Sequence, residues 1–364
     1  MKIRFSKKWI SWLALIVLVV LLKMASVSPA FIEKYYSNGL YPLMGASLRY
    51  LFGWIPFSFG DLLYSFVIIF LIYKLVRIIK TMRAGGFNRK YLKLIFRKLL
   101  FFALLAYVIF YSLWGLNYSR AGIARQMGLA EAAYTVSDVD TLVQLLHGKL
   151  NAHAVSFTAA SRDSFKTKRS VFFNASLLYK IAATRFPFLV YKGYSVKPSL
   201  FSYLGNYAGF QGYYNPFTGE AQVNTTIPKS VEPFVVSHEI AHQLGYAKES
   251  EANFVGFLAC RLHPSINFKY SVYFDMYHYA IRELAIGDSV SAHRYDSTLH
   301  SQVKKDMKEY VAFYKKYRNP VEPYIDRFYG YFLKANNQPK GRASYNEVVG
   351  WLIAYYKKYG KGVI

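Results

Sequence analysis

The chain has few cysteines, acidic residues and histidines for its 364 residues. Its one cysteine, Cys260, excludes an intramolecular disulfide, and we expect it to pack as a small core residue. The sequence contains no glycine-rich phosphate loop, no Gly-x-Ser-x-Gly nucleophile motif and no internal repeat. These absences argue against a P-loop nucleotidase, a serine hydrolase of that type and a repeat protein.

Acidic residues are outnumbered, with 20 Asp and Glu against 46 Lys and Arg and a formal net charge of +26. Residues 1–117 hold 16 of the basic residues and only two of the acidic ones. This excess of basic over acidic residues lies around apolar segments. The chain also has no recognisable nucleic-acid-binding motif. We therefore expect attraction to anionic lipid or cell-envelope polymer, and no nucleic-acid partner.

Long apolar runs are present in spite of the charge, and 54% of the residues are hydrophobic. They predict three transmembrane helices, at about 9–25, 59–79 and 99–116. For the first of these, a cleaved signal peptide is the alternative interpretation, because small residues at 28–30 are typical of a cleavage point.

The segment between the first two spans, residues 26–60, is aromatic and nearly uncharged. Pro29, Pro42 and Pro56 interrupt it. Because tyrosine and tryptophan favour the boundary between lipid and water, we expect a loop that lies in the membrane interface.

Basic residues beside the spans predict their direction. The N-terminal tail is basic, and residues 80–98 hold seven Lys and Arg and no acidic residue. Short basic loops stay in the cytoplasm, so both are expected on that side. We predict a membrane domain over 1–117 in the inner (cytoplasmic) membrane. A second domain, 118–364, is then expected on the periplasmic or extracellular side.

Residues 238–242 carry the pattern H-E-x-x-H. Residues four apart on a helix share a face, so the imidazoles of His238 and His242 can bind one metal ion together. Zinc accepts two neutral imidazoles and a carboxylate, and keeps a further position for water. Glu239 can then take the proton of that water, as in zinc peptidases. The pattern predicts a Zn²⁺ site with Glu239 as the catalytic base, on a helix that ends near Gly245.

A third ligand must come from another segment, and the sequence offers Glu249, Glu251 and, further along the chain, His263. A helix from about Lys248 to Leu262 places Glu249 on a face of small and amide residues that can approach the metal helix closely. Glu251 falls on the large apolar face instead. Glu249 is therefore preferred, and Glu251 stays open as the alternative.

The run HEIAHQLGYAKESEANFVGFLA resembles the zincin-like motif of an uncharacterised bacterial membrane family, domain of unknown function 3810. The likeness extends to FIEKYYSNGLYPL (31–43), GWIPFSFGDLLY (53–64), WGLNYSR (114–120), GYYNPFTGEAQVN (212–224) and FLKANNQPKGRASY (332–345). The family implies a multi-pass membrane protein with a zincin-type domain, and implies no substrate. Zincins whose third metal ligand is a glutamate have a similar pattern. In them, the residue four positions after that glutamate hydrogen-bonds one of the histidines that bind the metal. This resemblance implies that role for Asn253 beside Glu249.

The fold expected for residues 118–364 is α+β, mostly helical and zincin-like. The segment 219–224 alternates polar and apolar residues just before the metal helix, as an exposed edge strand would. Glu220, Gln222 and Asn224 would share one face and bind the substrate backbone by β-addition. A plain surface strand is the alternative.

These features together predict a membrane-anchored zinc metallopeptidase that hydrolyses peptide bonds with a zinc-activated water. Its partners would be a peptide or protein substrate and the lipid bilayer. Two alternatives stay open, namely a zinc-binding membrane protein without turnover and a hydrolase of non-peptide cell-envelope amides. The candidates for donating to an oxyanion are Tyr213, Tyr214 and Tyr345, and spacing does not choose among them.

Overall fold

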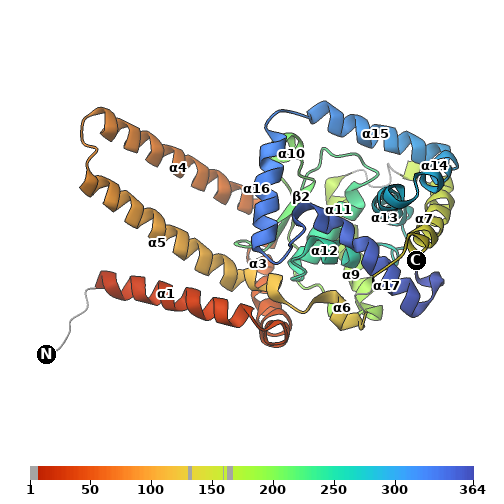
Figure 1. Cartoon of the computed structure of the whole chain (residues 1–364), viewed down its shortest axis with the longest axis horizontal. Coiled ribbons are helices and arrows are strands. Elements are labelled where there is room, and N and C mark those ends of the chain that lie inside the picture. The colour runs from red at the N-terminus through yellow and green to blue at the C-terminus, as the bar shows by residue number, and fades with distance from the viewer. Residues whose placement is uncertain (1–6, 130–132, 159, 162–166) are drawn as a thin grey trace.

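The computed structural model of the chain describes residues 7–129, 133–158, 160–161 and 167–364, and these are mostly helical. Figure 1 shows three long helices that project to one side of a rounded body, which consists mainly of helices and contains a small sheet. The expected predominance of helix, with few strands, is therefore confirmed.

The projecting helices are α1 (Lys7–Ser26), α4 (Phe59–Arg83) and α5 (Arg89–Leu113). Each is long and apolar enough to cross a membrane, and almost none of its apolar stretch is buried in the protein. The start of α1 and the turn between α4 and α5 lie at the end away from the body, and α1 packs along α5 (Figure 1). The three helices could therefore cross a bilayer together.

The basic stretch 80–98, expected as a cytoplasmic loop, is mostly helical. Helix α4 continues to Arg83 and α5 begins at Arg89, so only residues 84–88 form the turn. Lysine, arginine and leucine are good helix formers, and the side chain of Asn88 caps α5 by accepting the N–H of Tyr91. The basic residues therefore lie mainly on the two helices.

The segment 26–60 is also not a loop. It folds into α2 (Pro29–Phe31), a π-helix η1 (Ile32–Leu40) and α3 (Tyr41–Gly53). Pro29 and Pro42 stand in the first turns of α2 and α3, where the missing N–H has no helical partner to lose. They start helices here instead of breaking them.

The body holds eleven further described helices and four short 3-10 turns. The helices are α6 (Gly122–Met127), α7 (Val136–Ser156), α9 (Lys168–Arg185), α10 (Ser202–Ala208), α11 (Glu232–Gln243), α12 (Glu249–Cys260), α13 (Ile266–Gly287), α14 (Ser289–Ser297), α15 (Ser301–Tyr317), α16 (Glu322–Ala335) and α17 (Val348–Tyr359). The turns are η2 (Gly115–Ser119), η3 (Pro187–Leu189), η4 (Gly341–Glu347) and η5 (Lys361–Val363). Helices α7, α9, α11, α12, α13 and α17 enclose the main hydrophobic core, in which Cys260 is fully buried.

A three-stranded sheet packs against α11. Its strands are β1 (Val196–Pro198), β2 (Gly212–Asn215) and β3 (Glu220–Val223), in the order β1-β3-β2. Strand β3 is parallel to β1 and antiparallel to β2. The expectation of an exposed edge strand at 219–224 is therefore wrong, because β3 is the central strand and is buried along its length.

The direction of the projecting helices can be tested with single cysteines. Burial raises the pKa of Cys260 to about 12, so the native thiol gives little background with maleimides. Phe87→Cys lies in the turn between α4 and α5, and Val290→Cys lies on α14, where the native side chain is 80% exposed. Because basic ends stay in the cytoplasm, an impermeant maleimide should label only Val290→Cys in spheroplasts.

Both variants should label once the cells are lysed, which controls for reactivity. Labelling of Phe87→Cys in intact spheroplasts, without labelling of Val290→Cys, would reverse the predicted orientation.

Candidate metal centre

The H-E-x-x-H pattern lies on α11, a buried helix that follows the sheet. Pro233 stands in its first turn and favours the start of a helix. Just past its end, Gly245 has a φ of 86°, a left-handed conformation that ends a helix at little cost only for glycine. The spacing of four residues then places His238 and His242 on one face of α11.

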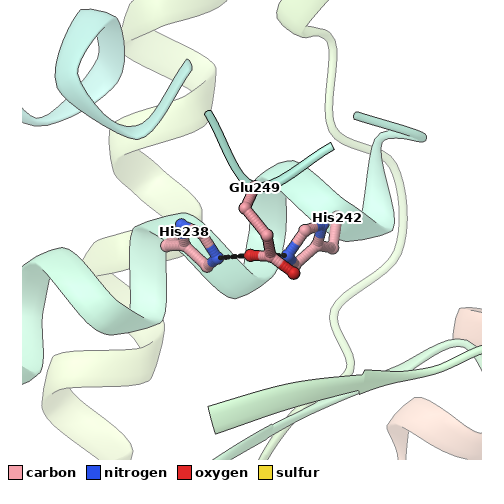
Figure 2. A group of neighbouring side chains, drawn as sticks. All are labelled: His238, His242 and Glu249. Atoms are coloured by element: carbon pink, nitrogen blue, oxygen red, sulfur yellow. Dashed lines mark ion pairs between the residues drawn. The ribbon is translucent and has the colours of Figure 1, made fainter. Parts of the chain in front are cut away.

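Glu249, the first residue of α12, meets both histidines. Figure 2 shows its carboxylate between the two imidazoles. Its Oε2 lies 3.2 Å from Nε2 of His238 and 3.4 Å from Nε2 of His242. The ligand atoms of the three residues lie within 4.8 Å of one another, and all three side chains are buried. This His-His-Glu group could hold a metal ion.

Neighbouring groups orient each of the three side chains. Nδ1 of His238 donates to Oδ1 of Asn253 at 2.8 Å, and Nδ1 of His242 donates to the carbonyl of Tyr246 at 2.7 Å. Both imidazoles therefore turn Nε2 toward Glu249, which is the nitrogen that a metal ion would bind in their neutral forms. The hydroxyl of Tyr329, on α16, donates to Oε1 of Glu249 at 2.8 Å, which leaves Oε2 toward the histidines. This donor set fits a metal ion.

The three side chains of the group shift one another's pKa values. Burial alone would raise the pKa of Glu249, but the two imidazoles hold it well below its usual range. Burial lowers the pKa of His238. Burial alone would also lower the pKa of His242, but the Glu249 carboxylate raises it to about 9. At neutral pH the metal-free group therefore holds an ionised Glu249, a protonated His242 and a neutral His238.

Glu251, the alternative third ligand, lies elsewhere. Its carboxylate is buried beside Gly122, and Lys248 approaches it to 3.7 Å. It is not part of the His-His-Glu group. His263, at the far end of the same stretch, packs its ring against Phe268 and is also outside the group.

The close approach of α12 to α11 depends on small residues, as its sequence suggested. A Cβ at Gly256 would lie 3.0 Å from the ring of Phe234 and 3.6 Å from the backbone N of His238. Ala252 and Ala259 share this buried side of α12. The two helices can therefore bring Glu249 and Asn253 to the histidines.

Residues that precede the body in the sequence hold the end of α11. Tyr41 and Arg49, both on α3, donate to the carbonyl of Gln243 at 3.0 and 2.9 Å. Trp114, at the end of α5, donates its indole N–H to the carbonyl of His242 at 3.2 Å. Contacts thus cross the domain boundary expected at 117, and they tie α3 and the end of α5 directly to α11.

A cavity of about 1080 Å³ opens beside His238 and Glu239. Burial raises the pKa of Glu239 to about 8, and its Oε2 has no hydrogen-bond partner among the described residues. Gly212 on β2 makes room for this side chain, since a Cβ there would lie 2.6 Å from Oε1 of Glu239. Glu239 therefore presents a carboxyl group to the cavity beside the metal group.

Other polar groups of the cavity wall were not singled out in the sequence. Asp275 on α13 is 7% exposed, its Oδ2 has no partner in the described residues, and burial raises its pKa well above the usual range. His278, one turn further on, has its pKa lowered to about 4 by burial. Their spacing is that of any amphipathic helix, so only the structure brings them to this cavity.

The three residues proposed for substrate binding, two on β3 and Asn224 just after it, have partners within the protein. The carboxylate of Glu220 accepts the N–H groups of Phe59 and Gly60 and so caps α4. Nε2 of Gln222 donates to Ser58, and Nδ2 of Asn224 donates to Asn206 and to the carbonyl of Phe210. Glu220 and Gln222 thus fix the sheet to the start of α4, and only Asn224 lines the cavity.

The three candidate oxyanion tyrosines occupy different places. Tyr345 and Tyr213 line the cavity, and the Tyr345 ring stacks 6.5 Å from that of His238. The Tyr213 hydroxyl donates to Asp61. Tyr214 faces the ring of Trp114 and is not part of the cavity wall.

The chain was compared with known protein families, curated proteins and solved structures. A family described as "Protein of unknown function (DUF3810)" matches residues 36–353. No curated protein and no solved structure gives a significant match.

Metal content of single variants tests the third ligand. Glu249→Gln should lose most of the bound zinc, because it removes the charge that faces both imidazoles. Glu251→Gln, on the same helix, should retain it. Elemental analysis after desalting gives the metal content, and circular dichroism checks that both variants fold. Retention in Glu249→Gln with loss in Glu251→Gln would overturn the assignment.

Metal binding should also release a proton. With the pKa of His242 raised to about 9, a metal ion that binds at pH 7 must displace the proton on that imidazole. Apparent affinity should therefore rise about tenfold per pH unit from pH 7 toward 9 and then level off. Calorimetric titration with zinc in buffers of different ionisation enthalpy measures the protons released. A value near zero at pH 7 would contradict the charge state described above.

Proposed function

The chain belongs to this family, DUF3810, and we propose that it is a membrane-anchored zinc metallopeptidase that hydrolyses peptide bonds. The observation that carries the proposal is the buried His238, His242 and Glu249 group, beside which Glu239 presents a carboxyl group to a large cavity. Two imidazoles and one carboxylate are the ligands of many catalytic zinc sites. The zincin-like character of the body is part of the same proposal.

Each residue has a role that follows from its place. His238, His242 and Glu249 hold the metal, and Asn253 and the carbonyl of Tyr246 fix the imidazoles with Nε2 toward it. A zinc ion bound there supplies Lewis-acid chemistry, polarising a carbonyl and lowering the pKa of a water molecule.

Glu239 is the general base. Its carboxylate takes a proton from the attacking water and gives it to the leaving amine. Gly212 leaves the space in which this side chain can face the substrate. We further propose that the body lies outside the cytoplasmic membrane, with a peptide or protein as its substrate.

Replacement of the base separates chemistry from metal binding. Glu239→Gln should keep its zinc, because no ligand is changed, and should lose about 10²- to 10⁴-fold in kcat. Glu232 is a buried glutamate in the first turn of the same helix, so Glu232→Gln is the matched control. This variant should keep both its zinc and its kcat. The measurement is turnover of a peptide library by zinc-loaded protein in lipid nanodiscs.

Equal turnover by Glu239→Gln and the wild type would refute Glu239 as base. Turnover of cell-envelope amides in place of peptides would reassign the substrate to non-peptide amides.

A further inference from the structure

Helix α16 carries an apolar stripe that the body does not cover. Val321 just before the helix, and Tyr324, Phe328 and Tyr331 within it, are 59%, 70%, 76% and 63% exposed. Their spacing of three and four residues places them on one face. A helix with an exposed aromatic face is typical of the boundary between lipid and water.

The other side of α16 faces the metal centre and the end of a projecting helix. Leu333 is fully buried, and Tyr329 donates to Glu249. Asn336, just past the helix, accepts the hydroxyl of Tyr111 on α5 at 2.9 Å. Figure 1 shows α16 on the side of the body from which the long helices project, running crosswise to them. If those helices cross a bilayer, α16 lies along its surface.

Helix α10 extends this apolar surface. Leu200 just before it, and Tyr203, Leu204 and Tyr207 within it, are 44% to 67% exposed. It packs beside α16, and Nδ2 of Asn319 donates to the carbonyl of Tyr207 at 2.7 Å. The two helices together form one apolar platform.

Basic residues border this platform. Lys315, Lys316 and Arg318 are exposed where α15 leads into α16. Basic side chains beside an apolar face favour contact with anionic headgroups.

The cavity that contains His238 and Glu239 reaches the same surface. Its wall includes Val67 and Ile68 of α4, and Leu204 of α10. Ile68 lies about 13 Å along α4 from its start, at about 1.5 Å per residue, within the apolar stretch that could cross a membrane. The cavity therefore has a polar end at the metal centre and an apolar side formed by a candidate span.

We propose that α10 and α16 rest in the headgroup region, and that the cavity opens between α4 and α10 onto the bilayer. The substrate is then a polypeptide with an apolar membrane anchor, cut close to that anchor. The apolar wall takes the first part of the anchor, and the metal centre takes the peptide bond beside it. This substrate class rests on the proposed peptidase function, whereas the opening to the bilayer does not.

Binding without turnover tests the opening. The probe is one fluorescent peptide in three forms: free, palmitoylated, and fused to an apolar 20-residue helix. Zinc-loaded Glu239→Gln in nanodiscs should bind one or both anchored forms at least tenfold more tightly than the free form, after subtraction of empty nanodiscs. Preference for one anchored form identifies the anchor as acyl chain or transmembrane helix.

Adjacent residues of α4 provide the matched pair of variants. Ile68 lines the cavity, whereas Ile69 is 65% exposed and does not. In the Glu239→Gln background, Ile68→Trp should abolish the preference for anchored peptide, and Ile69→Trp should keep it. Equal binding of free and anchored peptides, or equal effects of the two tryptophans, would overturn the inference.

Turnover by the enzyme with Glu239 intact separates this inference from the proposed function. Faster cleavage of anchored peptide, lost in Ile68→Trp, supports both. Cleavage of free and anchored peptides at the same rate overturns the substrate class and leaves the peptidase. Preferential binding of anchored peptide without any cleavage overturns the peptidase and leaves the opening to the bilayer.

The contact of α16 with lipid has its own readout. An environment-sensitive dye on Phe328→Cys should be quenched by nitroxide lipids, and the same dye on Val290→Cys should not. Equal quenching at both positions would overturn the interfacial placement of α16.

Discussion

The contact between one carboxylate oxygen of Glu249 and the Nε2 atoms of His238 and His242 is the interaction on which the site depends. It requires α12 to approach α11 closely, which Gly256 permits. It also requires each imidazole to direct its Nε2 toward Glu249, and the hydrogen bonds of Nδ1 to Asn253 and to the carbonyl of Tyr246 hold the rings in that orientation. Burying an ionised carboxylate between two imidazoles costs free energy unless a positive charge lies beside it. A metal ion bound by the three side chains, or a proton on one imidazole, supplies that charge.

Helix α3 and the ends of α4 and α5 also hold this arrangement in place. Tyr41, Arg49 and Trp114 donate to the last carbonyls of the metal helix. Glu220 and Gln222 bind the start of α4 to the sheet. A displacement of these segments would therefore shift the end of α11, which carries His242.

Helical spacing and apolar runs in the sequence predicted those features of the fold and of the site that depend on neighbouring residues. The spacing of His238 and His242, and the small-residue face that carries Glu249, are helical properties and could be read directly. The apolar runs of α1, α4 and α5 were equally plain. The prediction of a loop at 26–60 relied on its prolines and was wrong. Pro29 and Pro42 occupy the first turns of helices, where proline is tolerated. The rest depends on contacts distant in sequence. Strand β3 pairs with both β1 and β2, and its polar side chains can be buried because Ser58 and Gly60 hydrogen-bond to them. Nothing local separates Tyr329 from the other 33 tyrosines.

The central claim is that His238, His242 and Glu249 bind zinc in the folded protein. Zinc K-edge X-ray absorption of the purified full chain, with Glu249→Gln alongside, measures this directly. We expect two imidazole nitrogens and at least one carboxylate oxygen at about 2.0–2.2 Å from the zinc, and loss of that spectrum in the variant. A shell of oxygen ligands alone, or an unchanged spectrum in Glu249→Gln, would contradict it.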